Sequence, residues 1–328
     1  MKVSVLLFSF MVCIASSDAS AQQRHLHSSA GVGSNQIPMY VAKDLGLFEK
    51  YGLNVDLIVI TGGARGLQAL FGGSTHSANM AAMAPVRAAL SGGDVVIVGT
   101  ILNKSLQKFV TRKEIRNPAE LRNKKIGVAN FGGSSEFGAL LALREWKIPS
   151  EAVSLVPTGG GRERMIALEA GGIDGTLLSY AEASMAAKKG ATVLAEMTDL
   201  VPEFPDRAII VRRSTLEKER DNIKRFLQAI SEGIVKVRTE REKTIGSLAR
   251  HLRIDRRLAE ENYDENRDAY SFPPRVGRKG MQGVLDIIQQ QTGKPNSEFA
   301  MSRFVDESLI DELEREGFFK NIAPRAQK

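Results

Sequence analysis

The sequence predicts an α/β fold that is built as two similar lobes. Residues 25–60 have the pattern of a strand, a loop, a helix and a second strand. From residue 55 onward a strand, a Thr-Gly-Gly turn, a helix, a Gly-Gly turn and another strand follow, and the same succession begins again at residue 153. Two similar α/β units leave such a repeat, although unrelated βαβ units share much of this punctuation. An apolar strand at 206–211 then returns the chain toward the first unit.

The first 21 residues are predicted to be a secretory signal peptide. Lys2 supplies a positive charge, residues 3–15 are apolar but too few to span a bilayer, and the Ala-Ser-Ala run at 19–21 is a typical cleavage site. A buried N-terminal helix is the alternative, but the segment has no amphipathic face. We expect cleavage after residue 21 and a periplasmic chain that starts at Gln22.

The single cysteine, Cys13, lies inside this segment. A lipoprotein carries a small residue just before its cysteine, and Val12 is not small, so we do not expect a lipid anchor. The mature chain then has no thiol, disulfide or cysteine ligand. His25 and His27 share one face of the first predicted strand, but a metal site so near the terminus is disfavoured. We expect no metal and no other cofactor.

The charge of the chain argues against nucleic-acid binding. There are 45 Lys and Arg residues against 38 Asp and Glu, a formal net charge of +7, and the two signs are interleaved. A moderate positive field helps to attract anionic solutes or an acidic surface. The charge-rich run 212–257 is most simply the solvated face of C-terminal helices.

Helix signals are strongest in the first unit. Pro38 suits the first turn of a helix, where its missing N–H costs nothing. Apolar residues then recur at helical spacing, Gly46 and Gly52 break the chain, and residues 53–60 alternate as a strand. The loop 31–36 before this helix is small and polar, so it offers free backbone N–H groups to a ligand.

The second unit begins and ends with strands that cross between the lobes. The predicted crossings lie near residues 105–110 and 206–211, and two crossings make a hinge. We therefore predict lobe one in residues 22–105, lobe two in 106–206, and a return to lobe one in 207–328. The other expected elements are a helix start at 117–121, a strand at 124–128, a glycine turn at 131–135, a helix at 136–146, and helices from residue 217 with a break at 271–275.

The run PMYVAKDLGLFEKYGLNV at 38–55 carries a family resemblance. It is similar to the opening of the nitrate/sulfonate/taurine-type (SsuA-like) periplasmic solute-binding proteins of ABC importers, a family that includes thiamine-pyrimidine precursor binders and synthases. The resemblance implies a two-lobe Venus-flytrap fold of the type II-like class, with a mixed sheet flanked by helices in each lobe. Further similar segments lie at 68–70, 84–86, 92–100 and 118–129, and the similarity fades in the C-terminal third.

The resemblance also implies a function. Its members capture a small solute by hinge closure and deliver it to a permease in the inner membrane; here we expect a monomer that binds an anionic sulfonate, a carboxylate or a pyrimidine-like molecule. The family's synthases carry a cysteine-rich motif that this chain lacks, and no Ser-His-Asp order, H-E-x-x-H or G-x-S-x-G motif occurs. We expect a binding protein without catalytic residues. A biosynthetic enzyme on the same fold and a periplasmic sensor are the alternatives.

A ligand site is predicted where loops at the carboxyl ends of the strands converge, because ligands of open α/β sheets bind there. Free N–H groups and hydroxyls in these loops suit a carboxylate or sulfonate. The predicted ligand-binding residues are Ser34, Asn35, Gln36, Thr61, Gly62, Ala81, Met83, Asn103, Gly133, Ser134, Ser135, Ser179 and Tyr180.

Several of these residues also suit a purely structural role. Ser134 and Ser135 are typical N-caps, and Tyr180 has the character of a packing residue. Glu182 favours a helix cap over contact with a ligand amine. Arginines beside the glycine turns could clamp an anion, but arginines early in a helix are usually solvated; these are Arg65, Arg162 and Arg164.

Overall fold

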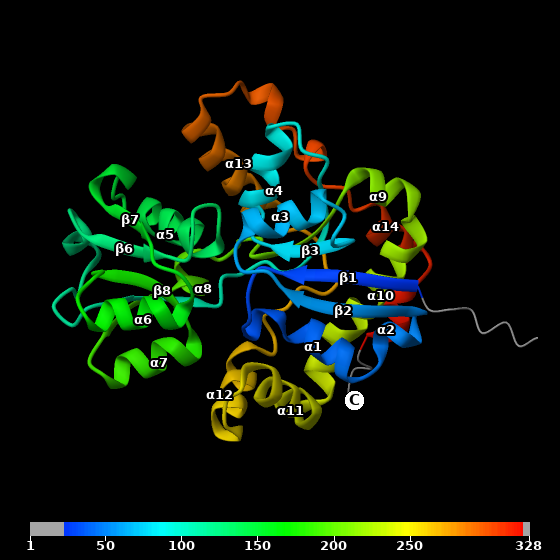
Figure 1. Ribbon diagram of the computed structural model, residues 1–328, viewed down its shortest axis with the longest axis horizontal. Helices are drawn as coiled ribbons and strands as arrows, with labels where there is room; N and C mark the ends of the chain where they lie inside the picture. The colour runs from blue at the N-terminus through cyan, green and yellow to red at the C-terminus, as the bar shows by residue number, and fades with distance from the viewer. Residues whose placement is uncertain (1–22, 324–328) are drawn as a thin grey trace, which may run out of the picture.

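The computed structural model describes residues 23–323. The predicted signal peptide, its cleavage site and Cys13 lie outside the described residues. The chain forms two five-stranded mixed sheets, each flanked by helices, which lie side by side as two lobes (Figure 1). This is the two-lobe α/β architecture that the sequence predicts.

The sheet of lobe one has the strand order β2-β1-β3-β10-β4. Strands β1, β2 and β3 are parallel, whereas β10 runs antiparallel to both β3 and β4. The three parallel strands point their carboxyl ends toward lobe two (Figure 1). The strand bounds are β1 Gln23–Ser29, β2 Leu53–Val59, β3 Ser77–Met80, β4 Val96–Leu102 and β10 Arg207–Val211.

The sheet of lobe two repeats this plan with the order β7-β6-β8-β5-β9. Its antiparallel strand β5 lies between β8 and β9, as β10 lies between β3 and β4. The Thr-Gly-Gly turns at 61–63 and 158–160 follow β2 and β7, which occupy the same edge position in the two sheets. The internal repeat is therefore a repeat of structure. The bounds are β5 Gln107–Thr111, β6 Lys125–Val128, β7 Ser154–Pro157, β8 Gly175–Ser179 and β9 Thr192–Glu196.

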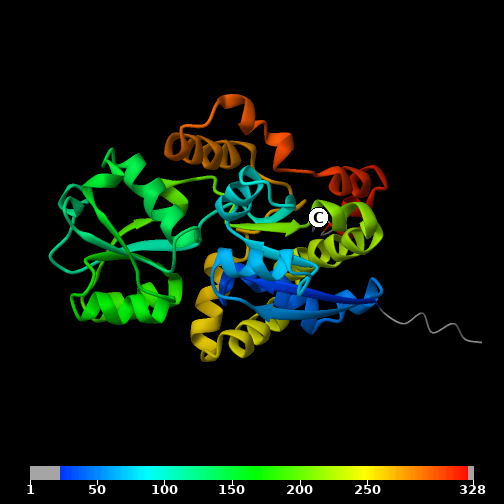
Figure 2. The same cartoon turned by 45° about the horizontal axis from the view of Figure 1, so that its top comes forward.

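The chain passes between the two sheets twice, from β4 to β5 and from β9 to β10. The two passages run side by side, because the Asp206 N–H donates to the Leu102 carbonyl at 3.0 Å and the Phe204 N–H donates to the Asn103 carbonyl at 2.7 Å. Figure 2 shows these narrow connections between the lobes. The arrangement has the form of a two-stranded hinge.

The helices cover both sheets, and the charged C-terminal run forms helices, as predicted. The predicted helix start at Asn117 is a single 3-10 turn, Pro118–Leu121, although its capping box is present. No helix within residues 23–323 has both the length and the apolar character needed to cross a bilayer. The helices are α1 Ile37–Asp44, α2 Leu47–Lys50, α3 Gly63–Phe71, α4 Met83–Leu90, α5 Ser134–Glu145, α6 Gly161–Glu169, α7 Tyr180–Lys188, α8 Met197–Leu200, α9 Arg213–Lys218, α10 Arg220–Thr239, α11 Arg241–Leu252, α12 Arg256–Asn266, α13 Arg278–Thr292, α14 Ser308–Arg315 and α15 Phe318–Ile322.

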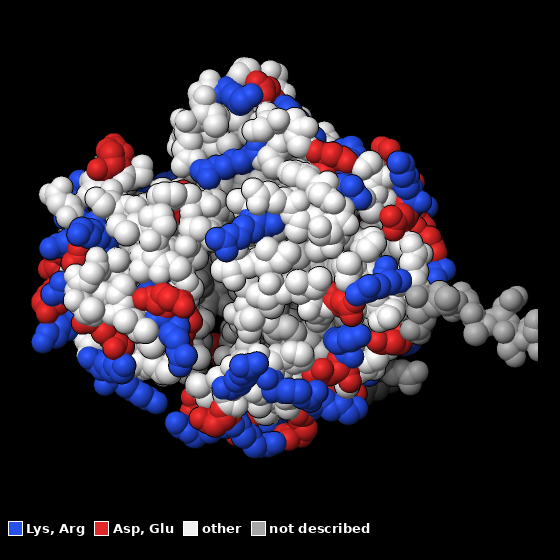
Figure 3. Space-filling view, in the orientation of Figure 1, with Lys and Arg blue, Asp and Glu red and all other residues white. Residues whose placement is uncertain are grey.

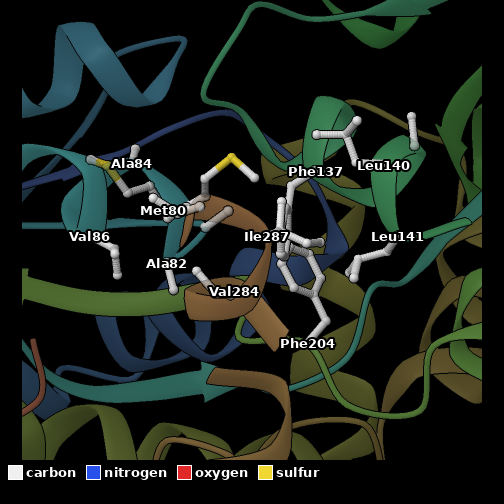
Figure 4. Close-up of a cluster of buried hydrophobic side chains, with 14 of the residues drawn as sticks. Met80, Ala82, Ala84, Val86, Phe137, Leu140, Leu141, Phe204, Val284 and Ile287 are labelled. Carbon is white, nitrogen blue, oxygen red and sulfur yellow. The ribbon is translucent and has the colours of Figure 1, made fainter. Parts of the chain in front are cut away.

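One buried apolar cluster runs through both lobes. It includes Val86 on α4, Phe137 on α5 and Ile287 on α13 (Figure 4). Phe204, in the second passage, packs against Phe137 with ring centroids 4.9 Å apart. Helix α13 follows the return to lobe one, yet the cluster joins it to α5 of lobe two as well as to α4. The C-terminal segment thus connects the lobes on this side.

A pair of buried histidines lies on β1. Both His25 and His27 are 1% exposed, and both rings bond the Ser77 hydroxyl, from His25 Nε2 at 2.6 Å and from His27 Nδ1 at 2.8 Å. Burial lowers the pKa of His27 from its ordinary 6.5 to about 3, and burial together with the neighbouring histidines holds the pKa of His25 well below its usual value. Both rings are neutral in the folded protein at neutral pH.

This pair predicts a loss of stability in acid. Below pH 6.5 the unfolded chain binds a proton at residue 27 that the folded chain does not bind until about pH 3. The free energy of unfolding should therefore decrease as the pH is lowered through this window, by up to about 1.4 kcal/mol per pH unit for each histidine. His27→Asn keeps a polar partner for Ser77 and removes one titration, so its slope should be shallower by that amount. Urea unfolding at several pH values tests this, and equal slopes would contradict it.

Candidate functional site

A cavity of ≈ 220 Å³ lies between the two lobes, at the carboxyl ends of β1, β6 and β8. Figure 3 shows a groove between the two lobes. The position of the cavity is the one expected for ligands of open α/β sheets. The lining residues are Ala30, Gly31, Val32, Gly33, Ser34, Asn35, Thr61, Leu106, Gln107, Ala129, Ser134, Ser135, Gly160, Gly161, Arg164, Ser179, Glu182 and Arg207.

The wall from lobe one is the loop before α1. Ser34 is buried, and its carbonyl accepts a hydrogen bond from the Tyr270 hydroxyl at 2.6 Å. Burial raises the pKa of Tyr270, so this hydroxyl stays protonated and donates. A residue that follows α12 thus holds the loop in place.

Arg207 enters the cavity from the return strand. It is 6% exposed, and its Nη1 donates to the Asp206 carbonyl at 2.7 Å and to Asp206 Oδ1 at 2.9 Å. Burial raises the pKa of the Asp206 carboxyl, while the Arg207 charge and hydrogen bonds with Asn35 and Ser134 act in the opposite direction. Asn35 belongs to lobe one and Ser134 to lobe two, so groups from both walls influence the Asp206 carboxyl.

Arg164 enters from lobe two, on α6. It is 4% exposed, and its two terminal nitrogens donate to the carbonyls of Gly159 at 2.6 Å and Leu177 at 3.0 Å. Burial lowers the pKa of this guanidinium, and the charges of Glu182 and Glu163 act in the opposite direction. The interpretation of Arg164 as a solvated residue is therefore wrong, whereas Arg65 and Arg162 are exposed, as expected.

The wall from lobe two is formed in part by the residues at the N-termini of α5 and α7. Ser179 is the N-cap of α7, and Glu182 completes a capping box by accepting from the Ser179 N–H at 3.0 Å and hydroxyl at 2.7 Å. Glu182 is thus a helix cap, as predicted. Ser135 is not an N-cap: its hydroxyl accepts from the Ala129 N–H at 2.8 Å and ties the loop after β6 to α5.

Unpartnered polar atoms gather around this cavity. Buried side-chain atoms without a hydrogen-bond partner include Nε of Arg164 and of Arg207, Oδ1 of Asn35 and Oε1 of Gln107, all on cavity residues. A buried polar atom without a partner costs about 1–3 kcal/mol, so natural proteins seldom leave several together. Two guanidinium nitrogens and two amide oxygens without a partner within residues 23–323 thus belong to residues that line one cavity.

The structure brings together six of the predicted ligand-binding residues at the cavity wall and leaves the other seven away from it. Gln36 bonds the Asn79 side chain, Asn103 holds the backbone at 275–277, and Tyr180 lies under Lys108. A Cβ on Gly62 would lie 2.6 Å from the Asn130 amide, so Gly62 is a contact between the lobes. The six at the wall are Ser34, Asn35, Thr61, Ser134, Ser135 and Ser179; the other seven are Gln36, Gly62, Ala81, Met83, Asn103, Gly133 and Tyr180.

Sequence reasoning missed Arg207 of the wall, and it considered Arg164 and Glu182 for ligand contact but favoured other roles for them. A signal for Arg207 was present, because Asp206 and Arg207 begin a strand that is otherwise apolar. Ionisable residues in such a strand are buried, and buried charges need partners. Within residues 23–323 no cluster of three His, Cys, Asp or Glu side chains is placed to hold a metal ion.

Comparison with known proteins identifies the family. Residues 33–242, more than half of the chain, match the model of the NMT1/THI5-like family. Comparison with curated proteins gives no match. Matches among solved structures cover most of the chain and include binding proteins and an enzyme.

The alkanesulfonate-binding protein SsuA from Xanthomonas axonopodis pv. citri, solved with MOPS bound, has a TM-score of 0.72 at 16% identity, over 87% of this chain and 98% of that chain. The periplasmic aliphatic sulphonate binding protein SsuA from Escherichia coli has a TM-score of 0.68 at 22% identity, over 83% and 87%. The desulfurization enzyme DSZB has a TM-score of 0.64 at 13% identity, over 89% and 100%. At these identities the likeness shows a common fold. With the match to the family model, it follows that this protein belongs to the NMT1/THI5-like family and has the two-lobe fold of periplasmic binding proteins.

Proposed function

We propose that this protein is the solute-binding component of an ABC importer. It captures a small polar molecule that carries an oxyanion, closes its two lobes over it, and delivers it as a periplasmic monomer to a permease in the inner membrane. The observation that carries the proposal is the interlobe cavity with two buried guanidinium groups, Arg164 and Arg207, whose Nε atoms have no hydrogen-bond partner within residues 23–323. Charged hydrogen bonds from such donors are the strong ones.

The family and the fold support this proposal. Two of the proteins with this fold are sulfonate-binding proteins by name, one of them solved with the sulfonate buffer MOPS. The two passages between the lobes form a hinge, and hinge closure is the usual way to bury a ligand between two lobes. A ligand in the cavity, at the carboxyl ends of strands from both sheets, would contact both lobes and favour the closed form.

An enzyme is the second candidate, because DSZB has the same fold. The lining of the cavity contains neither cysteine nor histidine. The Ser179 hydroxyl donates a hydrogen bond to the Glu182 carboxylate, as a catalytic serine could donate to a base. The same carboxylate also accepts the Ser179 N–H, so the pair forms a capping box, and the start of helix α7 explains both hydrogen bonds. Binding without chemical change is therefore the function that these side chains support best.

A bound solute should stabilise the protein and be released unaltered. A ligand at roughly 100 times its dissociation constant adds about 2.7 kcal/mol to the free energy of unfolding, because it binds only the folded state. A panel of short-chain sulfonates, carboxylates and pyrimidines, screened by thermal shift, should give at least one such compound. Mass spectrometry of the compound after long incubation should find the starting mass, and conversion to a product would favour the enzyme.

Arg164 should be required for binding. Arg164→Met removes a buried guanidinium from the cavity wall, and the affinity for a solute from this panel should fall by about 1.5–3 kcal/mol, the range for a hydrogen bond to a charged group. Arg162→Met is a matched control, since Arg162 precedes it on α6 and is exposed. Calorimetry of both variants checks this, with urea unfolding beside it because Arg164 also bonds two carbonyls. A folded Arg164→Met that binds like the wild type would place the ligand elsewhere.

A further inference from the structure

The charges around the cavity balance. Arg207 is paired with Asp206 at 2.9 Å, so this pair adds no net charge. Arg164 and Glu182 remain on the opposite wall, one positive and one negative, and their charges attract each other. A simple anion that entered the closed cavity would therefore leave a net negative charge in a buried site, which is costly. A ligand with one charge of each sign keeps the site neutral.

Glu182 has a carboxylate oxygen to offer such a ligand. Oε2 accepts both capping hydrogen bonds from Ser179, at 2.7 and 3.0 Å. Among the described residues, Oε1 has no hydrogen-bond donor and the carboxylate has no ion pair. Arg164 does not pair with it directly, because its terminal nitrogens donate to Gly159 and Leu177.

The position of this oxygen depends on a glycine. Oε1 lies where a Cβ on Gly161 would be, so any side chain at residue 161 would displace the carboxylate. Gly161 and Glu182 both line the cavity, and Gly161 is the first residue of α6. The Glu182 carboxylate is thus held at the cavity wall by the backbone at the start of α6 and by the cap of α7. A ligand in the cavity can reach it there.

We propose that Glu182 selects the solute by binding a cationic amine of the ligand, while Arg164 and Arg207 bind its oxyanion, so that the protein takes zwitterions in preference to simple anions. The proposal rests on the function proposed above and names the class of its solute. The cavity volume of ≈ 220 Å³ is below the range of about 300–1,000 Å³ found for drug-sized ligands. The solute is therefore a short-chain amino acid or aminosulfonate, with its two charged groups a few bonds apart.

Two matched pairs of compounds test the selection by calorimetry on the mature chain. The first pair is propane-1-sulfonate and 3-aminopropane-1-sulfonate, and the second is butanoate and 4-aminobutanoate. In at least one pair the amino compound should bind at least tenfold tighter than its simple anion. Glu182→Gln should remove that advantage, since a glutamine still caps the helix but carries no charge. Glu163→Gln is the control: it removes a charge that also acts on Arg164, but Glu163 is exposed and does not line the cavity, so the preference should remain.

The outcomes separate this proposal from the proposed function. Equal affinity for the two members of each pair, or a preference that Glu182→Gln leaves unchanged, would overturn the role of Glu182 while leaving solute binding intact. If none of the four compounds gave a heat of binding, the selection for short-chain zwitterions would be overturned. If none of the wider panel of sulfonates, carboxylates and pyrimidines bound either, the proposed function would fail as well.

Discussion

The buried ion pair of Asp206 and Arg207 is the interaction on which the rest of the site depends. It lies where the chain re-enters lobe one, and the Asp206 N–H bonds the end of β4. Taking two charges out of water is costly unless further hydrogen bonds satisfy them. Asn35 and Ser134, one from each lobe, act with Arg207 to lower the pKa of the Asp206 carboxyl against the effect of burial. The same pair therefore places a guanidinium in the cavity and relates the loops of the two lobes to each other.

The two sides of the interlobe contact differ in strength. On one side a single apolar cluster includes side chains of α4, α5 and α13, and burying such side chains is worth about 1.5–3 kcal/mol each (Figure 4). On the other side α12 meets lobe two through Lys108 and Glu265, a partly exposed pair at 3.5 Å, and such pairs contribute about 0–1 kcal/mol. The contact between the lobes is therefore more apolar on the α13 side than on the α12 side.

The chemistry of the cavity comes from positions that the fold brings together. DSZB and the two sulfonate-binding proteins share this two-lobe fold, so the fold by itself does not select between binding and catalysis. The side chains at the strand ends do. Here they supply two buried cations, two amides and a carboxylate, held by helix caps and backbone carbonyls. Such groups can orient a polar molecule through hydrogen bonds and charge.

The sequence by itself determined the two-lobe α/β fold, the return strand near residues 206–211 and the capping role of Glu182, because periodicity, glycine turns and caps act over a few neighbouring residues. It also pointed to the loops at the strand ends, and six of the thirteen residues chosen there line the cavity. The tertiary structure alone decided that Arg164 and Arg207 face one cavity and that α13 reaches α5 of lobe two. Burial and charge pairing depend on segments far apart in the chain, and their meeting has no local signal.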